Sequence, residues 1–233
     1  LLRDRPADIG LLPFGATEAP STVAAPATAR AALTTLWEAM HTVPFWILAF
    51  TFFVCGWSTN GLIGTHFISA AHDHGMPADT AAWLLSVVGI FDFIGTIASG
   101  WFTDRFNSNY LLFMYYGLRG LSLFSAPFVL GPSIEAPLVF FIVFYGLDWI
   151  ATVPPTVQLC RNYFGLAKSP VVYGWVFAWH MIGAAIAAIY GGWIRQATGT
   201  YTAAWYTAAI LCVVAALSVL VLNRIPYKRA EEA

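Results

Sequence analysis

Charged residues are scarce in this sequence. Only 10% of its 233 residues are charged, whereas 59% are hydrophobic and 16% are aromatic. Soluble domains carry about 25% charged residues, so a water-soluble fold could not hide this much apolar surface. The net charge of -1 also gives no reason to expect a nucleic acid as a partner. The composition therefore predicts a membrane protein.

The sequence is also poor in cysteine. Cys55, Cys160 and Cys212 lie in or at the ends of different apolar stretches and lack the spacing of metal ligands, so we expect neither a disulfide framework nor a zinc site, and no cofactor. A second possibility is an external metal site. Four possible ligands lie close together, but their spacing matches no known motif and favours a solvated loop: His66, His72, Asp73 and His74.

Long apolar stretches dominate what is present. A helix needs about 20 residues to cross the hydrocarbon core, and lipid offers no partner to backbone groups, which favours helices. Six stretches are long enough: about 44–70, 81–101, 110–130, 137–157, 170–193 and 203–222. The predicted fold class is an all-α membrane protein, a bundle of six transmembrane helices over residues 44–223.

The remaining residues form two predicted cytoplasmic regions. Residues 1–43 are expected to be a loop or linker with a short amphipathic helix at 28–40, and residues 224–233 a tail. Basic residues collect in cytoplasmic loops, so they set the orientation. With both ends inside, nine basic residues are cytoplasmic and Arg195 alone is external: Arg3, Arg5, Arg30, Arg105, Arg161, Lys168, Arg224, Lys228 and Arg229.

Two loop motifs carry a family resemblance. The segment Arg3–Leu11, followed by Pro13 and Gly15, resembles the central loop of major facilitator superfamily transporters. The turn at Gly100, Asp104 and Arg105 resembles the C-terminal copy of that superfamily's loop signature, without its usual run of basic residues. Other segments resemble bacterial members near the monocarboxylate and oxalate/formate transporters: 59–61, 66–67, 117–120 and 151–156.

The resemblance implies that the chain is the C-terminal half of a secondary transporter. Its expected partners are the N-terminal six-helix half of the same protein, the lipid bilayer, a small organic anion such as a monocarboxylate, and possibly protons. Residues 1–10 are expected to follow a preceding helix, so we expect a fragment. The implied location is the plasma membrane, a bacterial inner membrane by the same resemblance, and the implied activity is symport or antiport.

Two features are candidates for gating. In the family, the Asp and the basic residue that match Asp104 and Arg105 latch the two halves together; an ordinary polar turn is the alternative. Pro154 and Pro155 remove backbone donors from the fourth stretch and should kink it near the cytoplasmic gate.

Four ionisable residues lie inside the predicted spans, each near the midplane. A charge there is costly and is kept mainly where it is paired or functional. Asp92, Arg119, Asp148 and His180 could form a substrate and proton site, with Arg119 binding a carboxylate. The alternative, which we favour, is a structural pair between Asp92 and Arg119. Thr96 stands where monocarboxylate transporters carry an arginine, so that anion contact is absent.

Small and polar residues predict where a cavity lies. Gly56, Asn60 and Gly64, with Thr59 beside them, form a small polar face on the first stretch that should line a cavity. His180 could contact an anion there when protonated, or be a packed core residue. The run Gly183, Ala187 and Gly191 with its neighbours permits close helix packing and is interpreted as packing alone.

An enzyme is the rival class. An intramembrane serine hydrolase would need Ser99 as nucleophile and His180 as base. Ser99 is near the cytoplasmic edge and His180 near the midplane, so proton transfer over about 3 Å is not expected. We therefore predict no enzymatic activity.

Overall fold

The computed structural model describes residues 10–12 and 28–226. The chain divides into two units, Leu1–Leu33 and Thr34–Ala233. Of the first, the structure describes residues 10–12 and the stretch from Thr28, whose hydroxyl accepts a hydrogen bond from the Ala31 N–H at 3.2 Å and so caps a helix. The central-loop motif of residues 3–15 lies largely outside the described residues.

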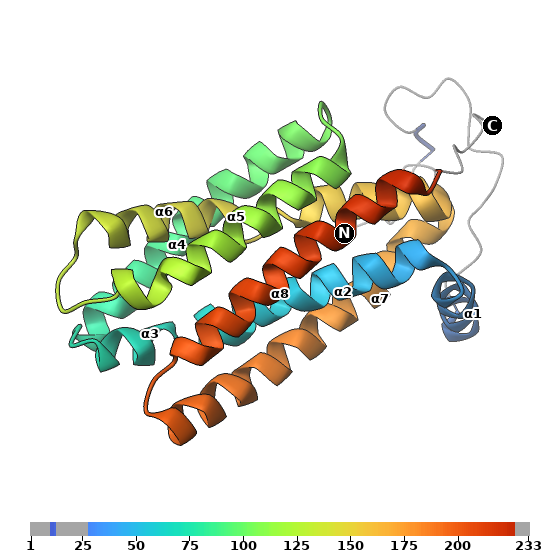
Figure 1. The fold of residues 1–233 in the computed structure, drawn as a ribbon. Coiled ribbons are helices and arrows are strands. Elements are labelled where there is room, and N and C mark those ends of the chain that lie inside the picture. Colours follow the sequence, from blue (N-terminus) through green and yellow to red (C-terminus); the bar gives the residue numbers. More distant parts are fainter. Residues whose placement is uncertain (1–9, 13–27, 227–233) are drawn as a thin grey trace. The chain divides into compact units, whose positions relative to one another are not determined.

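Every regular element in the described ranges is a helix (Figure 1). The elements are α1 (Ala29–Met40), α2 (Val43–Gly56), the π-helix η2 (Trp57–Ile63), α3 (Gly64–Asp73), α4 (Ala78–Thr103), α5 (Ser108–Val129), α6 (Ala136–Asp148), α7 (Val153–Thr198), α8 (Thr202–Val221) and the 3₁₀ turn η3 (Leu222–Arg224). The predicted amphipathic helix is confirmed as α1.

The first predicted span is one continuous helical segment built from α2, η2 and α3. It begins with Pro44 in its first turn, where the missing N–H costs nothing. In η2 the Gly64 N–H binds the carbonyl of Thr59, five residues earlier, which is the π pattern. The segment ends at His74, and Gly75 follows with a φ of 87°, a left-handed conformation that suits glycine.

Four segments of the described chain are long and apolar enough to cross a membrane. They are Val43–Asp73, Ala78–Thr103, Ala136–Thr198 and Thr202–Arg224. The third has 63 residues, far more than one crossing needs. It contains a turn at 149–152 and a second break at Gly165, whose φ is 77°. The count of six spans remains a prediction, since α5 does not meet the same criterion.

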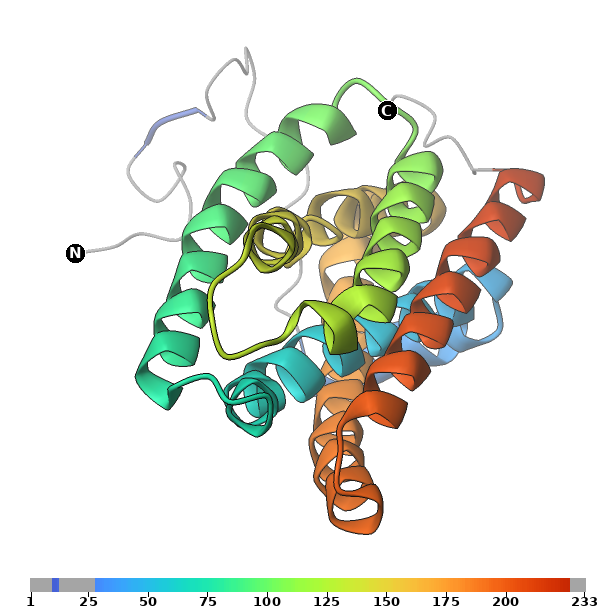
Figure 2. The same ribbon diagram turned by 60° about the vertical axis from the view of Figure 1, so that its left-hand side comes forward.

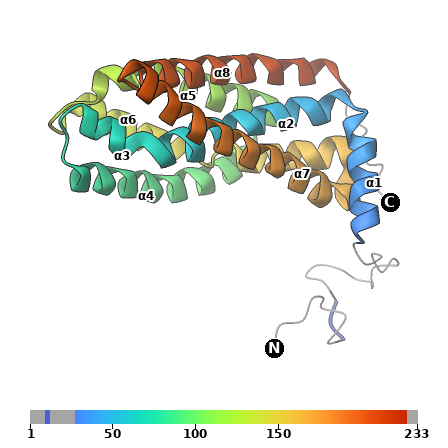
Figure 3. The ribbon, with the colours of Figure 1, turned by 90° about the horizontal axis from the view of Figure 1, so that it is seen from below.

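The helices of the second unit pack in pairs. The most extensive contacts join α5 to α8, α2 to α7 and α4 to α6. Figures 1 and 3 show α7 running beside α2, and Figure 2 shows α6 nearly end-on between α4 and α5. Within α7, three residues after the break at Gly165, Lys168 forms an ion pair with Glu38 of α1.

Glycines allow α2 and α7 to touch. A Cβ atom added at Gly56 would lie 1.9 Å from the His180 carbonyl oxygen, and one added at Gly183 would lie 2.1 Å from the Phe53 carbonyl oxygen. Any larger side chain would push the two backbones apart. The packing interpretation of the small-residue run on α7 is therefore confirmed.

The outer surface of the bundle is apolar. Large side chains such as Phe93, Phe128 and Ile189 are exposed over 70%, 78% and 75% of their surface. Water-soluble proteins rarely expose so many large apolar groups together, so this surface suits lipid. The chain has the apolar helices of an integral membrane protein.

Candidate functional site

The fourth predicted span is broken rather than bent. Helix α6 ends at Asp148, residues 149–152 form a turn, and α7 starts at Val153 with Pro154 and Pro155 in its first turn. Prolines have no N–H, so they cannot bind the carbonyls of the preceding turn. The kink predicted from the two prolines is not what the structure shows: one helix ends before them, and the prolines lie in the first turn of the next.

Arg119 of α5 binds this break. Its Nε donates to Asp148 Oδ2 at 2.5 Å, and its Nη2 donates to the backbone carbonyls of Asp148 at 2.5 Å and Trp149 at 3.1 Å. Its Nη1 donates to Cys55 Sγ at 3.3 Å and to Ser58 Oγ at 3.4 Å. These contacts occupy all five N–H donors of a guanidinium group. The side chain is fully buried.

The favoured pairing of Asp92 with Arg119 is therefore wrong, because the ion-pair partner is Asp148. Asp92 Oδ1 instead accepts from the Ile150 N–H at 3.0 Å and from the Thr96 hydroxyl at 3.3 Å. The physical reason is the helix break, which exposes an N–H toward α4 and two carbonyls toward α5. Asp92 on α4 therefore accepts from the freed N–H, and Arg119 on α5 donates to the freed carbonyls.

Ser99 completes the set of side chains around the break. Its hydroxyl donates to the Ala151 carbonyl at 2.5 Å. We call Asp92, Ser99, Arg119 and Asp148, with the turn at 149–152, the junction cluster. Backbone groups freed by the break thus find partners on two other helices, as buried polar groups must. Within the described residues, Asp148 Oδ1 is the one carboxylate oxygen left buried without a partner.

A cavity of about 140 Å³ lies against the junction cluster. We call it the His180 cavity. Its lining comes from α2, η2, the turn at the break and α7, and consists of Phe52, Cys55, Thr59, Asn60, Trp149, Ile150, Val153, Phe177 and His180. The cavity is mainly apolar, with a few polar groups, which is the usual character of small-molecule sites.

His180 is held in the cavity wall by aromatic rings. Its ring stacks on Phe177 with centroids 5.2 Å apart and planes 8° apart, and lies 5.4 Å from the Phe52 ring. The residue is 8% exposed, and its Nδ1 has no hydrogen-bond partner in the described part of the chain. Buried polar atoms are usually paired, so an unpaired imidazole nitrogen on a residue that lines a cavity makes His180 a candidate for binding a ligand.

The structure brings part of the predicted polar face of the first span to this cavity. Thr59 and Asn60 line the cavity, and Asn60 is exposed while the Thr59 hydroxyl donates to the Cys55 carbonyl at 2.7 Å. Gly56 instead packs against the α7 backbone. Sequence reasoning missed the aromatic lining from Phe52 and Phe177, which a lipid-facing helix would show equally well.

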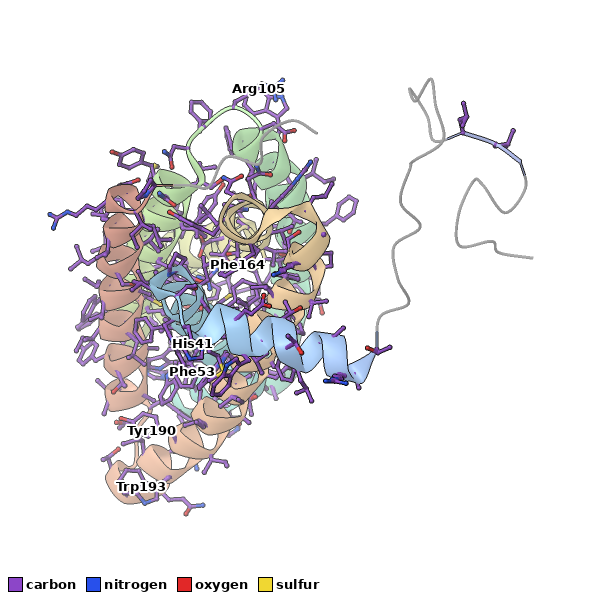
Figure 4. All side chains as sticks on the ribbon, turned by 90° about the vertical axis from the view of Figure 1, so that its right-hand side faces the viewer. His41, Phe53, Arg105, Phe164, Tyr190 and Trp193 are labelled. Atoms are coloured by element: carbon purple, nitrogen blue, oxygen red, sulfur yellow. The ribbon has the colours of Figure 1, made fainter. Side chains whose placement is uncertain are left out.

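The loop signature lies at the end of α4. Arg105 folds back over the Trp101 ring at 4.0 Å and donates to the Trp101 carbonyl at 3.2 Å, and Figure 4 shows it at the periphery of the bundle. Asp104 is the C-cap of α4, and Gly100 has open space where a Cβ would be. A latch through Asp104 and Arg105 to another half stays a prediction.

The structure does not bring together the residues required for the serine hydrolase or for the metal site. The Ser99 hydroxyl donates a hydrogen bond to the Ala151 carbonyl, while His180 stacks on Phe177, so the two side chains do not form a pair of nucleophile and base. Among the residues of the proposed metal site, Asp73 pairs with Arg195 at 2.7 and 2.8 Å and His66 contacts the Ala188 carbonyl. The described residues contain no group of three metal ligands.

Comparison with known proteins adds the family. The model of the Major Facilitator Superfamily matches residues 67–233. Monocarboxylate transporter 13 of Bos taurus is 33% identical over 147 residues, which are 61% of this chain and 33% of that protein. Monocarboxylate transporter 12-B of Danio rerio is 28% identical over 161 residues, 65% of this chain and 32% of that protein. The match spans about a third of the length of these relatives.

Solved structures share the fold. A major facilitator superfamily transporter, FucP, in the outward conformation matches with a TM-score of 0.67 and 18% identity, over 88% of this chain and 49% of that one. A variant of the Escherichia coli fucose:proton symporter FucP matches with a TM-score of 0.66 and 16% identity, over 83% and 45%. At these identities the likeness concerns the fold alone.

Proposed function

The chain belongs to the major facilitator superfamily, and on that basis we propose that it is the C-terminal half of a secondary transporter for a small organic anion, such as a monocarboxylate. The family consists of membrane transporters, so the chain is part of a transport protein and not of an enzyme. Its match to about half of a solved transporter supports one six-helix half of two. Substrate would then bind between the halves and reach each side in turn.

The observation that carries the proposal is His180, which lines a mainly apolar cavity and whose Nδ1 has no partner in the described part of the chain. Protonated, the imidazole offers one N–H to an anion, and the exposed Asn60 offers an amide beside it. Arg119 is not available, because protein groups bind all of its donors. We therefore assign the anion contact of this half to His180 and Asn60, with Thr59 in the wall.

The substrate class rests on the relatives. Those with the sequence similarity given above are named monocarboxylate transporters, and a single cation in an apolar wall suits an anion with one charge. The relatives are animal proteins, so the bacterial origin inferred from the resemblance stays a prediction. We place the chain in a plasma membrane with both ends cytoplasmic.

The coupling proton has two candidate carriers on this half. His180 has its free Nδ1, and Asp148 has its unpaired Oδ1 next to Arg119. A proton on either changes the charge beside the cavity, which would link proton and substrate binding. Asp104, Arg105, Pro154 and Pro155 are proposed to serve gating, the first two as the latch to the N-terminal half.

Uptake by the full-length protein in liposomes tests the proposal. A panel of monocarboxylates, dicarboxylates and neutral sugars is offered with an inward proton gradient, and again after an uncoupler has removed it. We expect uptake of monocarboxylates that falls with the uncoupler and is lost in His180→Ala combined with Asn60→Ala. Uptake of sugars in preference to carboxylates would overturn the substrate class.

Orientation has its own test. Single cysteines placed at Gly75 and Gly199 should react with an impermeant thiol reagent from outside intact cells, and one at Asn107 should not. The opposite labelling would place the ends of the chain outside. Denatured samples, in which all sites react, provide the control for expression.

A further inference from the structure

Asn60 is the one exposed residue of the π-helix η2. The segment Trp57–Ile63 has seven residues, and the other six are buried. Asn60 also lines the His180 cavity. Successive residues of an α-helix are about 100° apart, so a rotation of η2 by one residue would turn position 60 toward its packed neighbours. The proposed contact between Asn60 and the substrate therefore depends on how η2 is held.

Side-chain hydroxyls of the first span bind carbonyls in and beside η2. The π form is rare in proteins, so contacts besides the backbone bonds are expected where it persists. The Thr59 hydroxyl donates to the Cys55 carbonyl at 2.7 Å. The Thr65 hydroxyl donates to the Asn60 carbonyl at 2.9 Å. Both bonds join residues of the same helical segment, so they do not fix η2 against the rest of the bundle.

Tyr145 of α6 ties η2 to another helix. Its hydroxyl donates to the Ser58 carbonyl at 2.8 Å, two residues before Asn60. The side chain is fully buried and is not among the residues that line the His180 cavity, so Tyr145 lies behind the cavity wall. Its ring meets the ring of Trp149 edge-on, with centroids 5.8 Å apart. Because Trp149 lines the cavity, Tyr145 contacts both irregular segments that form the wall, η2 and the turn at 149–152.

The segment η2 is thus held from two helices in two different ways. On α7, the backbone of Ala184 packs against Gly61, where an added Cβ atom would lie 2.6 Å from the Ala184 carbonyl oxygen. On α6, Tyr145 binds the Ser58 carbonyl. The contact at Gly61 limits how closely the helices approach but has no preferred direction, whereas a hydrogen bond is directional. The Tyr145 bond is therefore the contact that fixes the rotation of η2 and, with it, the direction of Asn60.

We propose that Tyr145 is a positioning residue for substrate binding, whose hydroxyl fixes the rotation of η2 and so holds the Asn60 amide toward the cavity. The inference rests on the proposed function, in which Asn60 contacts the substrate. Tyr145 does not itself touch the solute, because its side chain has no exposed surface. Without the hydroxyl, the Ser58 carbonyl loses its bond to α6, η2 can rotate about the contact at Gly61, and the amide is no longer fixed toward the cavity.

Uptake kinetics of the full-length protein in liposomes test the role of Tyr145, with radiolabelled lactate as the probe. Tyr145→Phe should raise KM by about tenfold and leave kcat within about twofold, because a contact made equally in binding and in transport is lost. Tyr190→Phe is the matched control. It removes a hydroxyl that joins α7 to α8 through a hydrogen bond of 2.9 Å to Thr207, so it should leave KM unchanged. An unchanged KM in Tyr145→Phe, or an equal rise in Tyr190→Phe, would overturn the proposal.

A double-mutant cycle shows whether Tyr145 acts through Asn60. Asn60→Ala removes the amide, so adding Tyr145→Phe to it should raise KM by no more than about a further twofold. Two residues that act on the substrate independently would instead multiply their effects on KM. A multiplied rise would mean that Tyr145 acts on the site by a route other than Asn60, and the proposal would be wrong.

A labelling assay tests the direction of residue 60 without transport. Asn60→Cys is made in the full-length protein in detergent, and its reaction with a water-soluble methanethiosulfonate is measured above that of the protein without the new cysteine. Adding Tyr145→Phe should slow this reaction by about tenfold, and adding Tyr190→Phe should not change it. Equal rates in all three proteins would contradict the positioning role. If labelling changes as expected but neither lactate nor another carboxylate is transported, the role of Tyr145 stands and the proposed function fails.

Discussion

The junction cluster and the His180 cavity share the wall formed by Trp149 and Ile150, but their polar groups are in opposite states. In the junction cluster, Arg119 uses every donor on protein acceptors, and Asp92 and Ser99 bind backbone groups of the break. In the cavity, His180 Nδ1 has no partner in the described chain, and Asn60 is exposed. The two sites therefore differ in how many polar groups they leave open to a solute.

The difference shows how to sort ionisable residues inside a membrane span. A charged residue whose hydrogen bonds are all made by protein groups stabilises the fold and has little left to offer a solute. A residue with an open donor or acceptor beside a cavity is the better candidate for binding. Asp148 has features of both classes, because one carboxylate oxygen binds Arg119 and the other is unpaired.

The largest expected effect is at Arg119. Arg119→Ala leaves Asp148 charged and two carbonyls unpaired inside the bundle, and should lower the stability of the full-length protein by about 3–5 kcal/mol. The measurement is the fraction that remains monodisperse by size-exclusion chromatography after heating in detergent. Replacing both Arg119 and Asp148 by Leu should recover part of the loss. Wild-type stability in Arg119→Ala would show that the cluster is not structural.

A smaller effect is expected at Asp92. Asp92→Ala leaves the Ile150 N–H without its acceptor and should cost about 1–3 kcal/mol in the same heating assay. Asp92→Asn retains a side-chain oxygen that can accept the bond, so it is the matched control and should lose little. If the Asn variant is as unstable as the Ala variant, the charge matters more than the hydrogen bond, and the account of the break needs revision.

At His180 we expect stability and transport to separate. His180→Gln removes a side chain with no hydrogen bond to Nδ1, so thermal stability should change little. Histidine is the side chain that ordinarily changes charge near neutral pH, so the dependence of uptake on pH between 5 and 8 should flatten. If uptake keeps the wild-type pH profile, the proton carrier is Asp148 or a residue of the other half.

The smallest effect is expected at the ion pair between Asp73 and Arg195. Asp73 and Arg195 form two hydrogen bonds, at 2.7 and 2.8 Å, but Arg195 is exposed to solvent. Exposed pairs contribute little because water screens them. Asp73→Asn should leave the heating curve unchanged. A loss comparable to that of Arg119→Ala would mean that pairing, and not burial, decides the strength of the junction cluster.

Much of the fold could be predicted from sequence. Apolar stretches and turn residues placed α4, α5 and α8 within a few residues of their ends, because lipid forces helices and loops are polar. The break between α6 and α7 was predicted as a kink. A proline in the sequence indicates that backbone hydrogen bonds are lost, but it does not indicate whether the helix bends or ends there. The second break, at Gly165, lies in the connector predicted between residues 157 and 170.

The candidate site was predictable only in part. Counting residues places Asp92 and Asp148 at the same depth, so depth alone cannot say which of them meets Arg119. The answer depends on how each helix is rotated and on the turn at 149–152, which changes the rotation after Asp148. For the same reason Asn60 and His180 were predicted in the cavity but its aromatic wall was not.

The π-helical segment Trp57–Ile63 has a consequence for alignments of this chain with its relatives. A π turn holds roughly one more residue than an α turn, so α2 and α3 are out of step with a regular helix. A relative that keeps an ordinary α-helix here should lack one residue between positions 57 and 63. An ungapped alignment would then pair Thr59 and Asn60 with residues on the wrong side of the relative's helix, and transferring functional positions across this segment requires a gap inside it.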